Sequence, residues 1–259
     1  MKKFTTSLLA ALLFALVFTA ISNLGNVKVS AKSFTADLDG DGTDETIEYE
    51  ISGEEYDLKL DYVTINGIAA KLEEDHFDCE IISVSLFNSC TTDKFMEVLV
   101  MKSVDNWTVF YLYRYNNGKV TKYCEIEADE IIAQKKKNRI TEKDDVYVRS
   151  IGNFYVTRTL KVKSGEVVYD INAVIKPNKD NSRFTFKTNR KLTLYSDESF
   201  SEKIKTLKNG SKIKIIKFKF DDEGYLSKVC VKSKGVTGWI DTSAFDYSDF
   251  IIENPPFWG

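Results

Sequence analysis

The chain has 259 residues and a formal net charge of −3, with 13 tyrosines, 17 phenylalanines and three prolines. The acidic balance argues against nucleic acid as a partner, because a phosphate-binding surface needs net or clustered positive charge. The aromatic content and the scarcity of proline are typical of β-structure, and the length allows one large domain or two small ones.

The N-terminus is predicted to be a secretory signal peptide, residues 1–31. Lys2 and Lys3 form a basic start, an apolar run covers Leu8 to Ile21, and small residues follow at Val29–Ala31. The apolar run is short for a bilayer-spanning helix, so an uncleaved membrane anchor is the weaker alternative. We therefore expect a secreted, extracellular protein without a stable membrane span. Removing this segment leaves 33 basic against 39 acidic side chains, a formal charge of −6.

The first motif with a chemical meaning is the acidic stretch DLDGDGTDETIEYE, Asp37–Glu50. Its spacing matches D-x-D-x-D-G followed by an acid at position twelve, which is the rule for a calcium loop. The loop positions one, three, five, six, seven, nine and twelve are Asp37, Asp39, Asp41, Gly42, Thr43, Glu45 and Glu48. Calcium prefers six to eight oxygen ligands, and a bound dication offsets the repulsion between the carboxylates. The alternative is a loop of Asx turns without metal.

The residues after the loop indicate a strand. Ile47, Tyr49 and Ile51 alternate with acids, whereas an EF-hand needs a helix on each side. The segment FTADLDGDGTDETIEYEI resembles the calcium loop and following strand of FG-GAP and VCBS repeats, which are blades of β-propellers. That resemblance implies calcium ligands at Asp37, Asp39, Asp41, the Thr43 carbonyl and Glu45, with Glu48 facing away.

Weak repeats extend this pattern over residues 32–180. GTDETIEYEI aligns with TTDKFMEVLV at Thr91–Val100, and both YVTINGIAAK and YLYRYNNGKVTK predict a hairpin with an Asn-Gly turn. A fainter third unit covers Asn153–Val174, and residues 125–137 favour a hairpin over a helix. A period of about 50 residues with short strands indicates propeller-like blades or a related β-array. Only the first unit keeps its aspartates, and three units are fewer than a closed propeller needs.

Catalytic and covalent signals are weak. His76 is the single histidine and lies among acids, without a nucleophile motif, so we predict that the chain is not an enzyme. Cys79, Cys90, Cys124 and Cys230 form an even set. They are either four small buried side chains or include one disulfide among the first three.

A second domain is predicted at residues 183–247, after a polar linker at Lys176–Ser182. Short alternating strands are separated by turns such as Asn209-Gly210, and the doubled Ile215-Ile216 predicts a β-bulge. Five short strands in about 60 residues are typical of a small barrel. The tail at residues 248–259 is expected to pack back on this barrel.

This region resembles the bacterial Src-homology-3 domain. The resemblance is carried by Leu194-Tyr195, by Leu207-Lys208-Asn209-Gly210 before a strand, and by Gly238-Trp239-Ile240 on the closing strand. It implies an all-β barrel that binds cell-wall peptides or peptidoglycan. Tyr195 and Trp239 are either ligand contacts near the strand ends or aromatic side chains that fill the barrel.

The sequence therefore predicts a secreted, non-catalytic binding module, in which a calcium-stabilised repeat domain precedes a wall-binding barrel. An extracellular adhesion protein and an accessory domain of a cell-wall hydrolase are the alternatives.

Overall fold

The computed structural model describes residues 29–54, 56–72, 79–105, 107–178, 185–247 and 249–256. These residues form strands, turns and loops without any helix, which confirms the all-β prediction, and so they hold no helical segment that could cross a membrane. Most of the expected signal peptide, the linker residues after Asn178 and His76 lie outside the described residues. Contacts divide the chain into two units, which we describe separately: residues 1–88 with 94–125, and residues 89–93 with 126–259.

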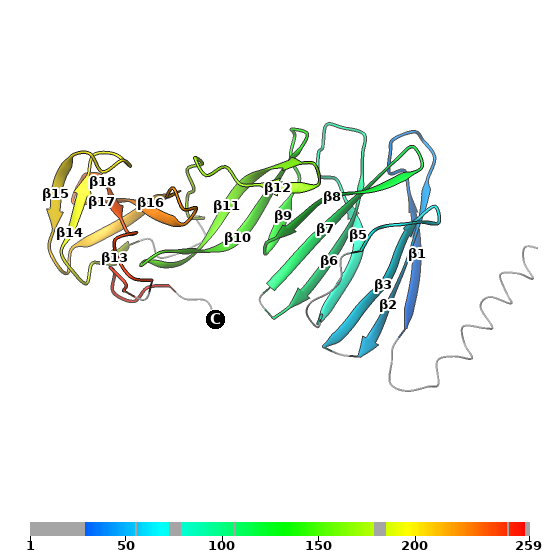
Figure 1. Ribbon diagram of the computed structural model, residues 1–259, viewed down its shortest axis with the longest axis horizontal. Coiled ribbons are helices and arrows are strands. Elements are labelled where there is room, and N and C mark those ends of the chain that lie inside the picture. The colour runs from blue at the N-terminus through cyan, green and yellow to red at the C-terminus, as the bar shows by residue number, and fades with distance from the viewer. Residues whose placement is uncertain are drawn as a thin grey trace, which may run out of the picture. The chain divides into compact units, whose positions relative to one another are not determined.

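The first unit contains two four-stranded antiparallel sheets whose strands follow chain order (Figure 1). The first sheet consists of β1 (Ser30–Ala36), β2 (Glu45–Glu54), β3 (Asp57–Ile65) and β4 (Ile68–Ala69). The second consists of β5 (Ile81–Phe87), β6 (Glu97–Val104), β7 (Trp107–Asn116) and β8 (Lys119–Glu127). Ser30 pairs with Ile51 on β2, so β1 includes two residues that the signal-peptide prediction assigns to the cleaved segment.

Both Asn-Gly hairpins are confirmed. Asn66 and Gly67 have φ angles of 50° and 75°, and Asn117 and Gly118 have 49° and 72°. Two successive positive φ values define the type I′ turn, whose twist matches that of paired strands. The two sheets share one apolar core, in which side chains from β2 and β3 pack with side chains from β6 and β7.

The second unit begins with a third four-stranded sheet, in the order β12-β11-β10-β9. Its strands are β9 (Glu130–Ile132), β10 (Arg139–Val148), β11 (Gly152–Lys163) and β12 (Glu166–Val168). The ambiguous segment 125–137 is not helical, but it does not form the expected hairpin by itself: residues 125–127 end β8 in the second sheet, whereas β9 pairs with β10. The described residues before the C-terminal strands therefore form three successive four-stranded antiparallel sheets.

The C-terminal strands form a six-stranded sheet in the order β13-β16-β17-β18-β14-β15 (Figure 1). They are β13 (Thr185–Lys187), β14 (Leu192–Tyr195), β15 (Lys203–Leu207), β16 (Lys212–Phe220), β17 (Leu226–Ser233) and β18 (Val236–Asp241). The register against β17 passes from Ile215 directly to Lys217, which confirms the bulge at Ile216. The described pairings include a sixth strand, and they leave the sheet open where a closed five-stranded barrel was expected.

One core joins the third sheet to the six-stranded sheet. Phe154 of β11 contacts Phe218 of β16 with ring centroids 5.1 Å apart, and Ile175 forms two backbone hydrogen bonds with Phe218. This arrangement groups residues 126–178 with the C-terminal strands, whereas the sequence suggested a boundary at 180–183. That boundary falls outside the described residues and stays a prediction.

The tail packs on the second unit through residues 249–256. Ile251 and Ile252 are almost completely buried in the core of this unit, and the Asn153 N–H donates to the Pro256 carbonyl at 2.8 Å. All four cysteines are buried and the structure forms no disulfide between them, which agrees with the alternative of four small buried side chains and not with a disulfide among the first three.

Candidate functional site

The acidic loop between β1 and β2 gathers three carboxylates. Oxygens of Asp37, Asp39 and Glu45 all lie within 4.8 Å of one another. Oxygen atoms this close, all from carboxylates, form a ligand set that suits a hard divalent cation. Coulomb repulsion between the same groups opposes the arrangement when no cation is bound.

Local hydrogen bonds explain why the loop adopts this shape. Both Asp37 carboxylate oxygens accept backbone N–H groups, from Gly40 at 2.7 Å and from Gly42 at 3.0 Å. The Leu38 N–H donates to Glu45 Oε2 at 2.8 Å across the loop. Gly42 has a φ of 89°, a conformation that glycine adopts readily and other residues rarely do.

Asp39 has a buried carboxylate oxygen without a hydrogen-bond partner among the described residues. It is 4% exposed, and its Oδ2 accepts the Asn117 N–H at 3.4 Å. Its Oδ1 is buried and finds no hydrogen-bond partner among the described residues. Because an unpaired carboxylate oxygen loses its hydration without compensation, it costs free energy unless an ion or water takes that place.

The other residues of the predicted ligand set lie differently. Asp41 and Thr43 are exposed, and Asp41 Oδ1 accepts the Thr43 N–H at 2.7 Å, so this carboxylate supports the turn. Glu48 is exposed on β2, whereas Glu45 is buried at the start of the same strand. The structure therefore gathers Asp37, Asp39 and Glu45. It also brings the Asn117 N–H to Asp39 as a hydrogen-bond donor, which the local spacing could not reveal.

A second group of acids lies on the third sheet. Glu142 on β10 is completely buried and pairs in register with Arg158 on β11, with which it forms an ion pair. Arg158 also donates to Asp144 Oδ2 at 2.9 Å and lies over the ring of Tyr169. Burial raises the pKa of Glu142 to about 7, Arg158 opposes the increase, and Asp144 adds to it. Two carboxylates, the completely buried Glu142 and the half-buried Asp144, thus share one guanidinium.

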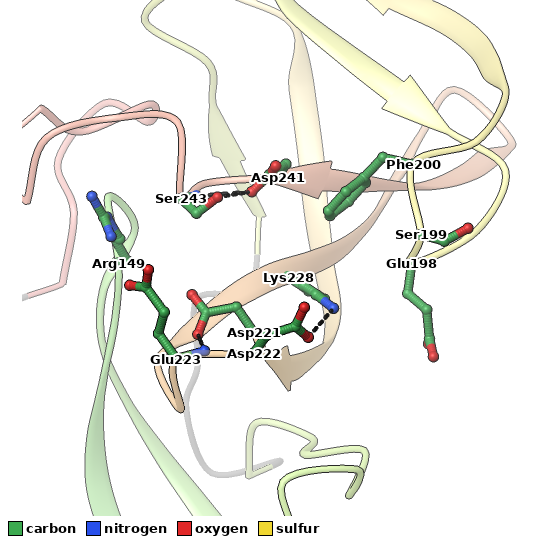
Figure 2. A pocket seen from close by; sticks show the side chains of 10 residues that line it. All are labelled: Arg149, Glu198, Ser199, Phe200, Asp221, Asp222, Glu223, Lys228, Asp241 and Ser243. Carbon is green, nitrogen blue, oxygen red and sulfur yellow. Dashed lines mark hydrogen bonds and ion pairs between the residues drawn. The ribbon is translucent and has the colours of Figure 1, made fainter.

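A pocket of about 660 Å³ opens at one end of the six-stranded sheet (Figure 2). The β14–β15 loop contributes Glu198 to Phe200, the β16–β17 turn contributes Asp221 to Glu223, and Asp241 ends β18. Arg149, from the β10–β11 turn, and Lys228 are its basic side chains. Five carboxylates against two cations give the lining a formal charge of −3.

Two of these acids shape the pocket. Asp221 accepts the Tyr225 N–H at 2.9 Å and the Ser227 hydroxyl at 2.6 Å. Burial raises the pKa of Asp221, but these hydrogen bonds outweigh the burial and hold the pKa below its usual value. Ser243 donates its hydroxyl to Asp241 at 2.6 Å (Figure 2).

The predicted aromatic contacts lie beside this pocket rather than in its lining. Trp239 on β18 is 7% exposed and is covered by Lys217, whose Nζ lies 4.9 Å from the ring centroid. Tyr195 pairs in register with Trp239 and packs edge-on against Phe200, which does line the pocket. Trp239 therefore offers little surface to a ligand, and Tyr195 reaches the pocket wall only through Phe200.

Comparison with family models, with curated proteins and with solved structures gives no match to this chain.

Proposed function

We propose that the chain is a secreted, non-catalytic binding module whose first unit is stabilised by calcium. The observation that carries this proposal is the buried Asp39 Oδ1, which lacks a protein partner among the described residues and lies in a group with Asp37 and Glu45. The D-x-D-x-D-G spacing supports the same ion from the sequence side. The three successive four-stranded sheets support the likeness to propeller repeats.

Calcium is favoured over magnesium by the nature of the loop. Magnesium requires near-ideal octahedral geometry and keeps much of its water, whereas calcium accepts irregular shells of carboxylate, carbonyl and water oxygens. Extracellular calcium modules have dissociation constants of about 10⁻⁴ to 10⁻³ M. At 10 mM calcium such affinities stabilise the folded state by about 1.4 to 2.7 kcal/mol.

Urea unfolding and calorimetric titration of the full chain test this proposal. We expect 10 mM calcium, compared with chelator, to stabilise the wild-type protein and the matched control Glu48→Gln, which changes an exposed acid on β2. Asp39→Asn and Glu45→Gln should lose the shift. In chelator, Asp39→Asn should be at least as stable as wild type, because it removes a buried unpaired charge. A wild-type protein that neither binds calcium nor gains stability would refute the calcium assignment.

The ligand-binding role is proposed for the second unit. It is supported by the resemblance to bacterial Src-homology-3 domains and by the acidic pocket at the end of the six-stranded sheet. A lining with a formal charge of −3 favours a cationic ligand, such as a free amino group of a cell-wall peptide. Asp222 and Glu223 are exposed in this lining and are the acids we expect to contact it.

Co-sedimentation of the full chain with purified peptidoglycan tests this role. We expect binding that weakens at 0.5 M salt and is lost in the double variant Asp222→Asn, Glu223→Gln. The matched control is Glu166→Gln, an exposed acid on β12 outside the pocket. Binding to intact cell surfaces but not to peptidoglycan would instead favour the adhesion alternative, and unchanged binding of the double variant would remove the pocket from the proposal.

A further inference from the structure

We propose that the cation at the acidic loop acts as a clasp between the first and second sheets, so that calcium controls how tightly the two sheets of the first unit hold together. This inference rests on the proposed calcium site. It goes beyond the identity of the ligands, because it states which contact in the first unit the bound ion stabilises.

The loop is attached to the second sheet through the residues that build the site. The Met96 N–H, directly before β6, donates to the Leu38 carbonyl at 2.9 Å. The Asn117 N–H, in the β7–β8 turn, donates to Asp39 Oδ2 at 3.4 Å. The carboxylate with the unpaired oxygen therefore also carries a contact to the neighbouring sheet.

Gly40 lets the loop approach the second sheet at very short range. It has a φ of 67°, and a Cβ at this position would lie 2.7 Å from Lys94 Cβ and 2.8 Å from the Lys94 carbonyl oxygen. Any larger residue would force the segments apart. The acidic loop and the segment leading into β6 thus lie in close contact at Gly40 and Lys94.

The bound cation makes the contact between the acidic loop and the second sheet depend on the calcium concentration. Without an ion, three carboxylates within 4.8 Å repel one another, and their repulsion favours movement of Asp39 away from its neighbours. A bound dication attracts all three carboxylates, so the net electrostatic interaction becomes favourable and holds Asp39 in place. Opening that moves Asp39 away from Asp37 and Glu45, and so breaks its contact with Asn117, then requires release of the ion. Mass action suppresses such opening by the factor 1 + [Ca²⁺]/Kd.

The two ends of the β6–β7 hairpin provide a comparison within the second sheet. Ser103 and Thr108 lie at the opposite end of the β6–β7 hairpin, where their hydroxyls are 3.0 Å apart. The shared core also holds the sheets together without the loop. Calcium should therefore slow exchange at the loop end of this hairpin more than at the Ser103–Thr108 end.

Amide hydrogen exchange of the full chain, measured residue by residue by NMR, tests the clasp. Calcium is set to ten times the Kd obtained by calorimetry, where mass action predicts about tenfold slower exchange of the Met96 and Asn117 amides. Glu48→Gln should show the same effect. Glu45→Gln, which keeps an acceptor for the Leu38 N–H, should show none.

The two proposals fail in different ways. If calorimetry detects no calcium binding, the calcium site itself is wrong and the clasp falls with it. If calcium binds but the Met96 and Asn117 amides exchange at unchanged rates, the calcium site stands and the clasp is refuted. An equal change at Thr108 and at Asn117 would also refute it, because the effect would then belong to the whole unit rather than to the loop.

Discussion

Replacing Glu142 with glutamine should remove most of the pH dependence of the second unit's stability at mildly acidic to neutral pH. Glu142 is completely buried on β10, and one of its oxygens, Oε2, lacks a hydrogen-bond partner among the described residues. Its single cation, Arg158, is shared with Asp144. The folded state therefore gains by keeping a proton on this pair of carboxylates.

The size of the effect follows from the pKa. Burial raises the pKa of Glu142 from 4.5 to about 7, and burial likewise raises that of Asp144 from 3.8 to about 6. Because the two share one arginine, their shifts are not independent, and we count one proton. A difference of about 2.5 pKa units corresponds to about 3 kcal/mol.

The direction follows from which state binds the proton more tightly. A raised pKa means that the folded state holds its proton at pH values where the unfolded chain has released it. The stabilisation is complete below pH 4.5 and is lost as the pH rises through about 7. Asp129 and Asp145 also have raised pKa values and act in the same direction. The lowered pKa of Asp221 has its effect below this window.

The assay is urea unfolding of the full chain between pH 5 and pH 8. A Trp107→Phe background leaves tryptophans only in the second unit, so fluorescence then follows that unit. We expect the free energy of unfolding to fall by about 3 kcal/mol over this range. Glu142→Gln should lose most of this decrease and be more stable than its parent at pH 8. Glu130→Gln, which removes an exposed ion pair with Lys143, should change stability by less than about 1 kcal/mol.

Two results would contradict this reasoning. Stability that rises from pH 5 to pH 8 would mean that the carboxylates are held ionised by Arg158 despite their burial. An unchanged slope in Glu142→Gln would place the titrating groups elsewhere in the unit.

Three further changes have outcomes that the structure predicts. Glu97→Ala should cost about 3 to 5 kcal/mol in urea melts, because it removes the completely buried carboxylate that pairs with the half-buried Arg114 on β7, whereas Lys122→Ala at an exposed ion pair should cost less than about 1 kcal/mol. Gly152→Ala should release the tail to limited proteolysis, because its φ is 110° and a Cβ would lie 2.4 Å from the Pro256 carbonyl oxygen. Cys124 should resist alkylation at pH 8 until urea is added, because burial raises its pKa to about 12, and mass spectrometry of the labelled peptides would detect earlier modification.

Features with a local cause were predictable from the sequence. The Asn-Gly turns follow from the positive φ angles that these residues tolerate, and the bulge follows from a break in the two-residue period at Ile216. The acidic loop follows from the spacing of its aspartates. In each case neighbouring residues determine the conformation, so no knowledge of distant contacts was needed.

Features that depend on distant segments were not predictable in the same way. The amide of Asn117 reaches Asp39 across 78 positions of the chain, and only the packing of two sheets brings them together. The shared core of the third sheet and the C-terminal strands is similar, because the alternation along β11 indicates one buried face without indicating its partner. A period of two defines which residues share a face, but the covering layer belongs to another part of the chain.

The buried acids show most clearly that a local sequence pattern does not reveal a partner on another strand. Along β10, Glu142 lies on the same face as Ile140 and Val146, where alternation alone would require an apolar side chain. The position is tolerated because the antiparallel register brings Arg158 directly opposite, and because the ring of Tyr169 lies over that guanidinium. A charge on a core face therefore indicates a partner on the adjacent strand, and the second sheet repeats the arrangement with Glu97 and Arg114. Each pair depends on its strand register, because a one-residue slip would move the guanidinium to the opposite face and leave a buried carboxylate alone.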